Sequence, residues 1–229
     1  MRLELLGAPL CRYVHRTAIL LHEKGLPFER RQVDLVTKPE WFLALSPRGK
    51  VPVLLVDGRP LFESPAINEF VDEVHGDRLL PDDPFERALH RAWLEIASDL
   101  FGAQYVLFHA KTAEEVEQAR VAVEPLLARF EDALSTGLVE DGGFGLLHAA
   151  VAPALHRFVL MEEHRGARFL KGVPRLDAWA RRLAARPSVV DTVVDACAAR
   201  WLQSLADGGS HIARGGARGL TSRSATASQ

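Results

Sequence analysis

Residues 46–65 read SPRGKVPVLLVDGRPLFESP, and this stretch decides the fold. Two apolar runs, Val51 to Val56 and Arg59 to Phe62, flank an Asp-Gly pair, which is a strong signal for a β-hairpin turn. Pro60 has no backbone N–H for a ladder, so the second strand is expected to be short or at an edge. Ser64-Pro65 then suits a helix start, with serine as the cap and proline in the first turn.

The residues before this stretch alternate between strand and helix patterns. Leu3 to Leu6 is a strand candidate, and the helix pattern Arg12 to Glu23 stops at Lys24-Gly25, a good C-terminal signal. A weak strand is expected at 28–34 and a short helix at 39–45. With the hairpin and its helix, the order β-α-β-α-β-β-α predicts a thioredoxin-like sheet.

The rest of the chain is predicted to be helical. Residues 77–84 contain two prolines and three aspartates, which is typical of a linker. The helices expected after it are 85–111, 113–134, 146–164, 176–185 and 189–205. The expected organisation is an α/β thioredoxin-like domain at 1–76, a linker at 77–84, an all-α domain at 85–206 and a disordered tail at 207–229.

Composition limits the class of protein. The formal net charge of −2 gives no general attraction to nucleic acid or to an anionic membrane. The two cysteines, Cys11 and Cys197, form no disulfide framework, which fits a reducing compartment. The sequence shows no signal-peptide core and no apolar run of membrane-spanning length, so a cytoplasmic protein is expected. The histidines show no convincing ligand spacing, and no metal is expected.

Cys11 is the first candidate for chemistry. It opens the helix 12–23, where the partial positive charge of a helix N-terminus and the cation of Arg12 favour a thiolate. Taken alone, Cys11 is better explained as a buried structural cysteine. Val14 stands three residues further on, so a Cys-x-x-Cys pair is excluded. Cys197 is expected to be a core residue of the last helix.

Two other elements change the interpretation of Cys11. The bond between Val51 and Pro52 is a candidate for cis, which would expose the Val51 N–H and C=O to an extended peptide. Ser64 and the free amides of its helix suit a carboxylate, and Glu63 suits an ammonium. Each element alone has a simpler explanation, as a loop end or a surface charge. With Cys11, they predict a site for a small thiol peptide.

The chain resembles a glutathione transferase and is most similar to the omega class of that superfamily. The motifs that carry the resemblance are TKPEWF at 37–42, SPRGKVPVL at 46–54, FESPAI at 62–67 and LPDDPFE at 80–86. The resemblance covers residues 1 to about 90 closely and the helical remainder in layout. It implies an α/β thioredoxin-like domain followed by an all-α domain, and a homodimer.

The resemblance also implies roles for single residues. Cys11 would form mixed disulfides with glutathione, the co-substrate. The glutathione-binding residues that it implies are Lys38 for the glycine end, Val51 with Pro52 for the cysteinyl backbone, and Glu63 with Ser64 for the γ-glutamyl end. Tyrosine or serine transferases activate the thiol of bound glutathione instead, whereas a cysteine favours thiol exchange.

Two departures from the family pattern stand out. Arg12-Tyr13 follows Cys11 where the family often has Pro-Phe or Pro-Tyr, which leaves one more backbone N–H for the thiolate. Residues 145–148 read GLLH where members usually carry a Ser/Thr-x-x-Asp capping box. The loss of both reciprocal caps is expected to cost about 1–2 kcal/mol of local stability.

Three functions are open from the sequence. The leading one is a glutathione-dependent thiol transferase or reductase acting on small disulfides, dehydroascorbate or S-glutathionyl organics. A second is an isomerase or dehalogenase in which glutathione adds to a carbon electrophile, and a third is a non-catalytic binding module. A small hydrophobic or disulfide acceptor is expected to contact the helix 85–111, with Trp93, Tyr105 and Phe108 as weak candidates, since aromatic side chains there more often fill a core.

Overall fold

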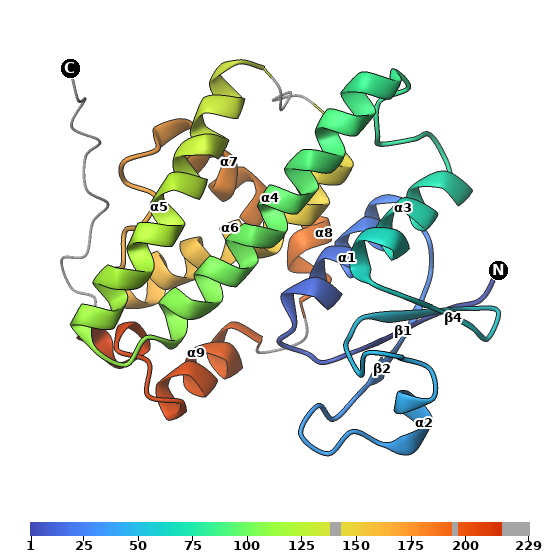
Figure 1. Cartoon of the computed structure of the whole chain (residues 1–229), viewed down its shortest axis with the longest axis horizontal. Helices are drawn as coiled ribbons and strands as arrows, with labels where there is room; N and C mark the ends of the chain where they lie inside the picture. Colours follow the sequence, from blue (N-terminus) through green and yellow to red (C-terminus); the bar gives the residue numbers. More distant parts are fainter. Residues whose placement is uncertain (138–142, 194–196, 217–229) are drawn as a thin grey trace. The chain divides into compact units, whose positions relative to one another are not determined.

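A computed structural model describes residues 1–137, 143–193 and 197–216 (Figure 1). The chain divides into two compact units. Unit 1 consists of Met1–Leu94, Phe144–Pro153 and Arg186–Cys197, and unit 2 consists of Glu95–Gly143, Ala154–Ala185 and Ala198–Gln229. The units therefore interleave along the chain. The domain limits 1–76 and 85–206 stay a prediction.

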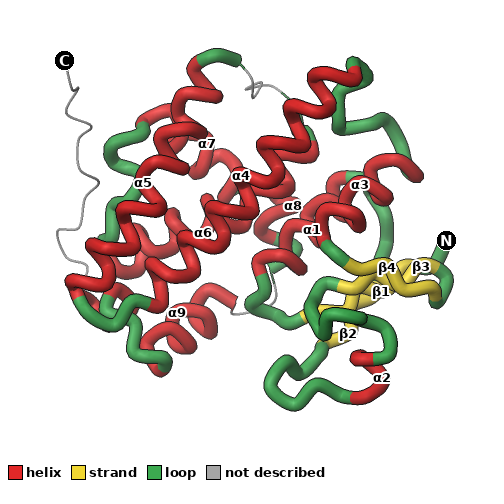
Figure 2. The backbone as a smooth tube through the Cα atoms, viewed as in Figure 1, coloured by secondary structure: helices red, strands yellow, loops and turns green. Residues whose placement is uncertain are grey.

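A four-stranded sheet forms the centre of unit 1 (Figure 2). Its strands are β1 (Leu3–Gly7), β2 (Glu29–Gln32), β3 (Val53–Val56) and β4 (Arg59–Phe62), in the order β2-β1-β3-β4. β1 is parallel to β2 and antiparallel to β3, and β3 is antiparallel to β4. This confirms the thioredoxin-like fold class predicted from the sequence.

The register of the strands places three chain segments together. Leu6, near the end of β1, is opposite Val53, and Val53 is in turn opposite Phe62, the last residue of β4. The end of β1, the start of β3 and the end of β4 therefore share one end of the sheet, which we call the Val53 end.

The inner and outer strands differ in their side chains. The central strands β1 and β3 are largely buried, whereas all four side chains of β2 are exposed and three of them are charged. β4 is the other outer strand and contains Pro60, in agreement with the edge position expected for it.

Helix α1 (Arg12–Glu23) has the bounds predicted from the sequence and packs against α3 (Ser64–Val74) and α8 (Pro187–Val190). Its last residue, Glu23, accepts hydrogen bonds from Arg186 Nε and Nη2 at 2.6 and 2.8 Å. Burial disfavours the charge on Glu23, but the hydrogen bonds and the positive charge of Arg186 outweigh it and leave the pKa of Glu23 below its ordinary value. The far end of α1 is thus fixed.

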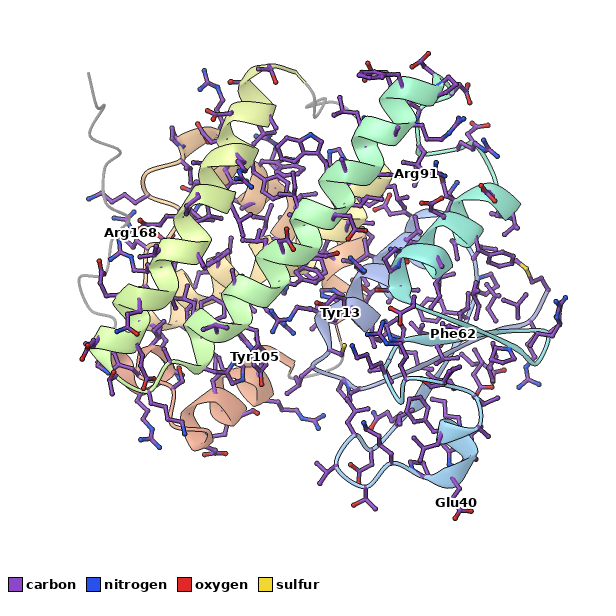
Figure 3. All side chains as sticks on the ribbon, in the orientation of Figure 1. Tyr13, Glu40, Phe62, Arg91, Tyr105 and Arg168 are labelled. Carbon is purple, nitrogen blue, oxygen red and sulfur yellow. The ribbon has the colours of Figure 1, made fainter. Side chains whose placement is uncertain are left out.

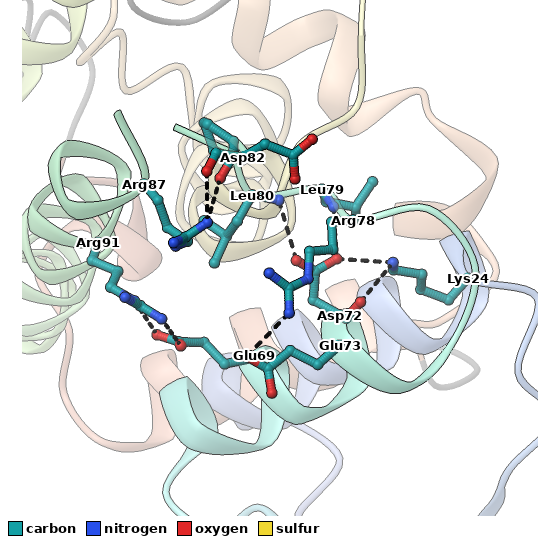
Figure 4. Close-up of polar contacts among 11 residues, drawn as sticks. Lys24, Glu69, Asp72, Glu73, Arg78, Leu79, Leu80, Asp82, Arg87 and Arg91 are labelled. Atoms are coloured by element: carbon teal, nitrogen blue, oxygen red, sulfur yellow. Dashed lines mark hydrogen bonds and ion pairs between the residues drawn. The ribbon is translucent and has the colours of Figure 1, made fainter. Parts of the chain in front are cut away.

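A buried carboxylate joins the ends of α1 and α3 to the loop that follows (Figure 4). Asp72 is 1% exposed, and its Oδ1 lies 2.8 Å from Lys24 Nζ. The same side chain accepts from the backbone N–H groups of Leu79, at 2.8 Å, and Leu80, at 3.1 Å. These bonds compensate the buried charge of Asp72 and fix Leu79 and Leu80, which lie in the segment 77–84 predicted to be a linker.

The remaining helices agree closely with the helices predicted from the sequence, with one exception. They are α2 (Glu40–Leu43), α4 (Pro84–His109), α5 (Ala113–Ser135), α6 (Leu146–Arg165), α7 (Pro174–Ala184), α8 (Pro187–Val190), α9 (Cys197–Asp207) and the π-helix η1 (Ile212–Gly216). The single helix predicted at 189–205 is wrong, because α8 and α9 are separate. The Thr192 hydroxyl donates a hydrogen bond to Ser188 O, and the Thr192 carbonyl accepts one from Arg30 Nη2 at 2.7 Å.

The start of α6 corrects the expectation that both caps are missing there. His148, three residues after Gly145, accepts a hydrogen bond on Nδ1 from the Gly145 N–H at 3.0 Å. This is the bond that the last residue of a capping box normally provides. One of the two reciprocal bonds is therefore present, from an imidazole in place of a carboxylate, and the expected loss of local stability is smaller.

The first residues of the segment predicted to be a disordered tail are folded. Ile212 is fully buried, His211 N–H donates to Ala110 O at 2.8 Å, and Arg165 Nε donates to Ala213 O at 2.6 Å. The prediction is therefore wrong for 207–216, because Ile212 and Ala213 are buried and the segment is bonded to Ala110, directly after α4, and to the Arg165 side chain of α6. Residues 217–229 lie outside the described part of the chain.

The stability of the protein is expected to decrease as the pH falls, through His156 on α6. Burial, together with the charge of Arg157, lowers the pKa of His156 to about 4. The unfolded chain, with a His pKa of about 6.5, takes up this proton first, so stability is complete above that value and is lost between the two values, by roughly 3 kcal/mol. Urea unfolding at about pH 7.5 and about pH 5 measures the part of the loss that falls above pH 5, about 2 kcal/mol.

The matched variants for this prediction are His156→Gln and His164→Gln, since His164 is an exposed residue of the same helix. His156→Gln should flatten the pH dependence and His164→Gln should leave it as in the wild type. An unchanged slope in His156→Gln would contradict the assignment.

Candidate functional site at the Val53 end of the sheet

Cys11 lies at the N-terminus of α1, directly after the turn that leaves β1. Its N–H donates to Ala8 O at 3.1 Å, and its C=O accepts from His15 N–H at 3.0 Å as the first bond of the helix. The thiol is free and half-buried. The first amides of a helix have no partner within it, and the Cys11 side chain forms no capping hydrogen bond to them.

The spacing between β1 and α1 is set by a close contact. A Cβ on Gly7 would lie 2.6 Å from Val14 Cγ1, a separation that real atoms do not adopt. Only glycine allows the end of the strand to approach the helix this closely. The position of Cys11 relative to the sheet therefore depends on Gly7.

The loop before β3 is also fixed by a buried side chain. Ser46, 3% exposed, donates from Oγ to Lys50 O at 2.9 Å and accepts from Lys50 N–H at 3.0 Å. The bond between Val51 and Pro52 is cis, which confirms the sequence prediction. β3 begins at Val53, so the peptide groups of Val51 lie outside the ladder.

Lys38 lies near this loop. Its side chain is exposed, and its Nζ is 3.5 Å from the point where a Cβ on Gly49 would stand. A cation beside the loop 46–50 suits the carboxylate end of a bound peptide. The role of Lys38 at the glycine end of glutathione stays a prediction.

Glu63 and Ser64 occupy the turn between β4 and α3. Glu63 has a φ of +66°, a left-handed value that is rare for a residue with a side chain and is concentrated at functional sites. Its Oε1 accepts from Arg48 Nη1 at 2.8 Å, and both side chains are about half exposed. The carboxylate predicted to bind an ammonium thus faces a cation of the chain itself.

Ser64 differs from the sequence expectation. It is the first residue of α3, which has no side-chain cap, and its buried hydroxyl is bonded to Arg16 of α1. Three residues around the site were not predicted from the sequence, namely Arg16, Arg48 and Ser46. One signal was present for Arg16, because it shares a helix face with the apolar Ile19 and Leu20 at i+3 and i+4.

The three segments meet at the Val53 end of the sheet. Cys11 follows β1, the cis bond precedes β3, and Ser64 follows β4, and the register places these strand ends side by side. Figure 3 shows Tyr13 on the first turn of α1, next to this end of the sheet. A thiol, an unpaired stretch of backbone and a helix start are therefore brought together within unit 1.

The three acceptor candidates have different surroundings. Phe108 is 2% exposed, and its ring packs in unit 2 against Phe158, Phe169 and Trp201, so we assign it to the core. Tyr105 is exposed and stacks on His109 with ring centroids 3.8 Å apart. Trp93 is half-buried in unit 1. A role for Trp93 or Tyr105 in binding an acceptor stays a prediction.

The described residues contain neither a membrane-spanning helix nor a metal-binding group of side chains. Within 1–137, 143–193 and 197–216, no helix has the length and apolar character needed to cross a membrane. The same residues contain no group of three or more His, Cys, Asp or Glu side chains arranged to hold a metal ion.

The chain is similar to known proteins along most of its length. Residues 10–74 match the model of the glutathione S-transferase N-terminal domain, and residues 113–182 match that of the glutathione S-transferase C-terminal domain. The relative described as probable glutathione S-transferase GSTU6, from Oryza sativa subsp. japonica, is 34% identical over 209 residues, which cover 84% of this chain and 89% of the relative.

Two solved structures resemble the fold of this chain. Glutathione transferase Omega 3C from Trametes versicolor has a TM-score of 0.75 at 29% identity, covering 85% of this chain and 90% of that one. Rice GST1 (OsGSTU1) in complex with glutathione has a TM-score of 0.78 at 28% identity, covering 90% and 95%. An omega-class protein and a rice protein thus resemble this chain to a comparable degree.

The fold and the site define a thioredoxin-like protein with a helical addition. The matches in both parts show more: the chain belongs to the glutathione S-transferase family. This is a family of transferases with glutathione as co-substrate.

Proposed function

We propose that this protein is a glutathione-dependent thiol transferase in which Cys11 forms a mixed disulfide with glutathione. The observation that carries the proposal is the free, half-buried thiol at the start of α1, at the same end of the sheet as the cis Val51–Pro52 bond and Ser64. A helix N-terminus favours the thiolate of a cysteine, and the thiolate is the form that takes part in exchange reactions. The glutathione complex of the similar rice protein supports the choice of peptide.

The proposed binding mode assigns each part of glutathione to one segment. Lys38 binds the glycine carboxylate, Val51 pairs with the cysteinyl backbone beside Pro52, and Glu63 with Ser64 holds the γ-glutamyl group. The Arg48 guanidinium on Glu63 supports this assignment, since the position it occupies suits a cation. The γ-glutamyl ammonium would share or replace that contact.

The proposed reaction has two exchange steps. The Cys11 thiolate attacks the glutathione sulfur of a mixed disulfide, forming a Cys11–glutathione disulfide and expelling the substrate thiolate, which takes up a proton. A glutathione thiolate then attacks this disulfide, producing oxidised glutathione and restoring the Cys11 thiolate. The second step needs external glutathione because Val14 stands where a resolving cysteine of a Cys-x-x-Cys pair would be.

Mass spectrometry of the wild-type protein after treatment with oxidised glutathione tests the proposal. One glutathionyl group is expected on the peptide that contains Cys11, and reduction should remove it. An unmodified Cys11 under conditions that modify a denatured sample would contradict the proposal.

A second candidate is conjugation, in which glutathione adds to a carbon electrophile. Its support is the similarity to plant relatives named glutathione S-transferases. A turnover number with a chloronitrobenzene acceptor above that with a small disulfide would favour it. The omega class, the homodimer, the cytoplasmic location and the small hydrophobic or disulfide acceptor stay predictions.

A further inference from the structure

Arg16 is a buried cation within the site. It lies one turn after Cys11 on α1, is 3% exposed, and donates from Nε and Nη2 to Ser64 Oγ at 3.0 and 2.5 Å. Its Cζ is 5.1 Å from the centre of the Tyr13 ring. The helix that carries the thiol is therefore bonded directly to the first residue of α3.

These two bonds determine what the Ser64 hydroxyl offers to a ligand. A hydroxyl has two lone pairs and one proton. Because two N–H groups of Arg16 point at Ser64 Oγ, the lone pairs are engaged and the proton is directed elsewhere. Ser64 is thus set as a donor, the role that suits a carboxylate, and the guanidinium charge lies directly behind it.

A second buried bond keeps the same two helices in register. Thr17, the residue after Arg16, donates from Oγ1 to Asn68 Oδ1 at 2.8 Å, and both side chains are buried. The packing of α1 on α3 does not therefore rest on Arg16 alone. A substitution of Arg16 can change the hydroxyl of Ser64 without separating the helices.

We propose that Arg16 is a positioning residue for ligand recognition: it orients the Ser64 hydroxyl as a donor to the α-carboxylate of a γ-glutamyl group. The proposal rests on the proposed function and adds a residue that does not itself touch the ligand. Arg16 acts through Ser64, so its effect is confined to ligands that carry this carboxylate.

Three peptides distinguish this role from a structural one. S-methylglutathione carries all three binding groups, and the S-methyl group prevents disulfide exchange. S-methyl-γ-glutamylcysteine lacks the glycine but keeps the α-carboxylate, whereas S-methyl 4-aminobutyryl-cysteinylglycine lacks only the α-carboxylate. Isothermal titration calorimetry measures Kd for each peptide with the wild type, Arg16→Gln, Arg16→Lys, Ser64→Ala and the double variant Arg16→Gln/Ser64→Ala.

Arg16→Gln is expected to raise the Kd of the first two peptides by about tenfold or more and to leave that of the third unchanged. Ser64→Ala should show the same pattern, and the double variant should be no weaker than Ser64→Ala alone. The Kd values of Arg16→Lys should lie between those of the wild type and of Arg16→Gln, because lysine keeps the charge but cannot point two fixed donors at one oxygen.

An equal rise in Kd for all three peptides in Arg16→Gln would overturn the proposal. So would an unchanged Kd for S-methylglutathione, or a loss of affinity in the double variant equal to the sum of the two single losses. If Arg16→Gln does not fold, the same comparison applies to Arg16→Lys, whose losses must again be confined to the first two peptides. Failure of the wild type to bind any of the peptides would refute the proposed function itself. Normal wild-type binding without the selective pattern would refute only the role of Arg16.

Discussion

Replacing Cys11 by serine is expected to lower the rate of glutathione-dependent disulfide reduction by about 1,000-fold or more. Serine keeps the size of the side chain and the helix start, so the change is confined to the nucleophile. Its hydroxyl is not ionised at neutral pH and forms no disulfide, so both exchange steps are lost. Reduction of hydroxyethyl disulfide, followed through the oxidised glutathione that it releases, measures the effect.

Cys197→Ser is the matched control, because Cys197 is the other of the two cysteines in the chain. We expect it to keep the activity of the wild type and the glutathionyl adduct on Cys11. Activity that survives in Cys11→Ser and disappears in Cys197→Ser would show that Cys197 is the nucleophile and would refute the assignment to Cys11. Conjugation that persists in Cys11→Ser would support the second candidate function.

The second large effect is expected at Asp72, where alanine should lower the free energy of unfolding by about 3–5 kcal/mol. The Lys24 side chain is 5% exposed and would remain buried without its carboxylate. The N–H groups of Leu79 and Leu80 would lose their acceptors at the same time. Urea unfolding followed by circular dichroism measures the change.

Glu73→Ala is the control for Asp72→Ala, since it removes a carboxylate from the neighbouring position of the same helix. The Glu73 side chain is 56% exposed and lies 3.9 Å from Arg78, so its loss should cost about 0.5 kcal/mol or less. Similar small losses in the two variants would show that the buried pair contributes little. In that case the ends of α1 and α3 would be held mainly by apolar packing.

The local sequence signals of residues 1–76 were sufficient to predict the strands and helices of this segment. The bounds of α1 and β4 were predicted to the residue, because Lys24-Gly25 and Asp57-Gly58 are strong stop and turn signals. Ser64-Pro65 placed the start of α3 one residue late, since Ser64 is the first helical residue and not the cap. The segments of the candidate site follow from the same elements, because the order of the strands brings their ends together. What a sequence pattern specifies well is therefore local geometry and topology.

The bonds of Ser46 to Lys50 and of Gly145 to His148 are local, but two other missed features depend on contacts between residues far apart in the chain. The bond from Arg30 to the Thr192 carbonyl spans 162 positions, and that from Arg16 to Ser64 spans 48. No local pattern reports such a partner. The folded segment 207–216 was missed for the same reason, since His211 bonds to Ala110 and Ala213 to Arg165, both much earlier in the sequence.

The outer strands of the sheet have a consequence for how the protein behaves in concentrated solution. Unpaired strands at a sheet margin are templates on which further chains can assemble into aggregates. Here β2 presents Glu29, Arg30 and Arg31 among its four residues, and β4 interrupts its free ladder with Pro60. Charge on one margin and a missing donor on the other oppose such growth, so we expect the protein to stay dispersed at high concentration.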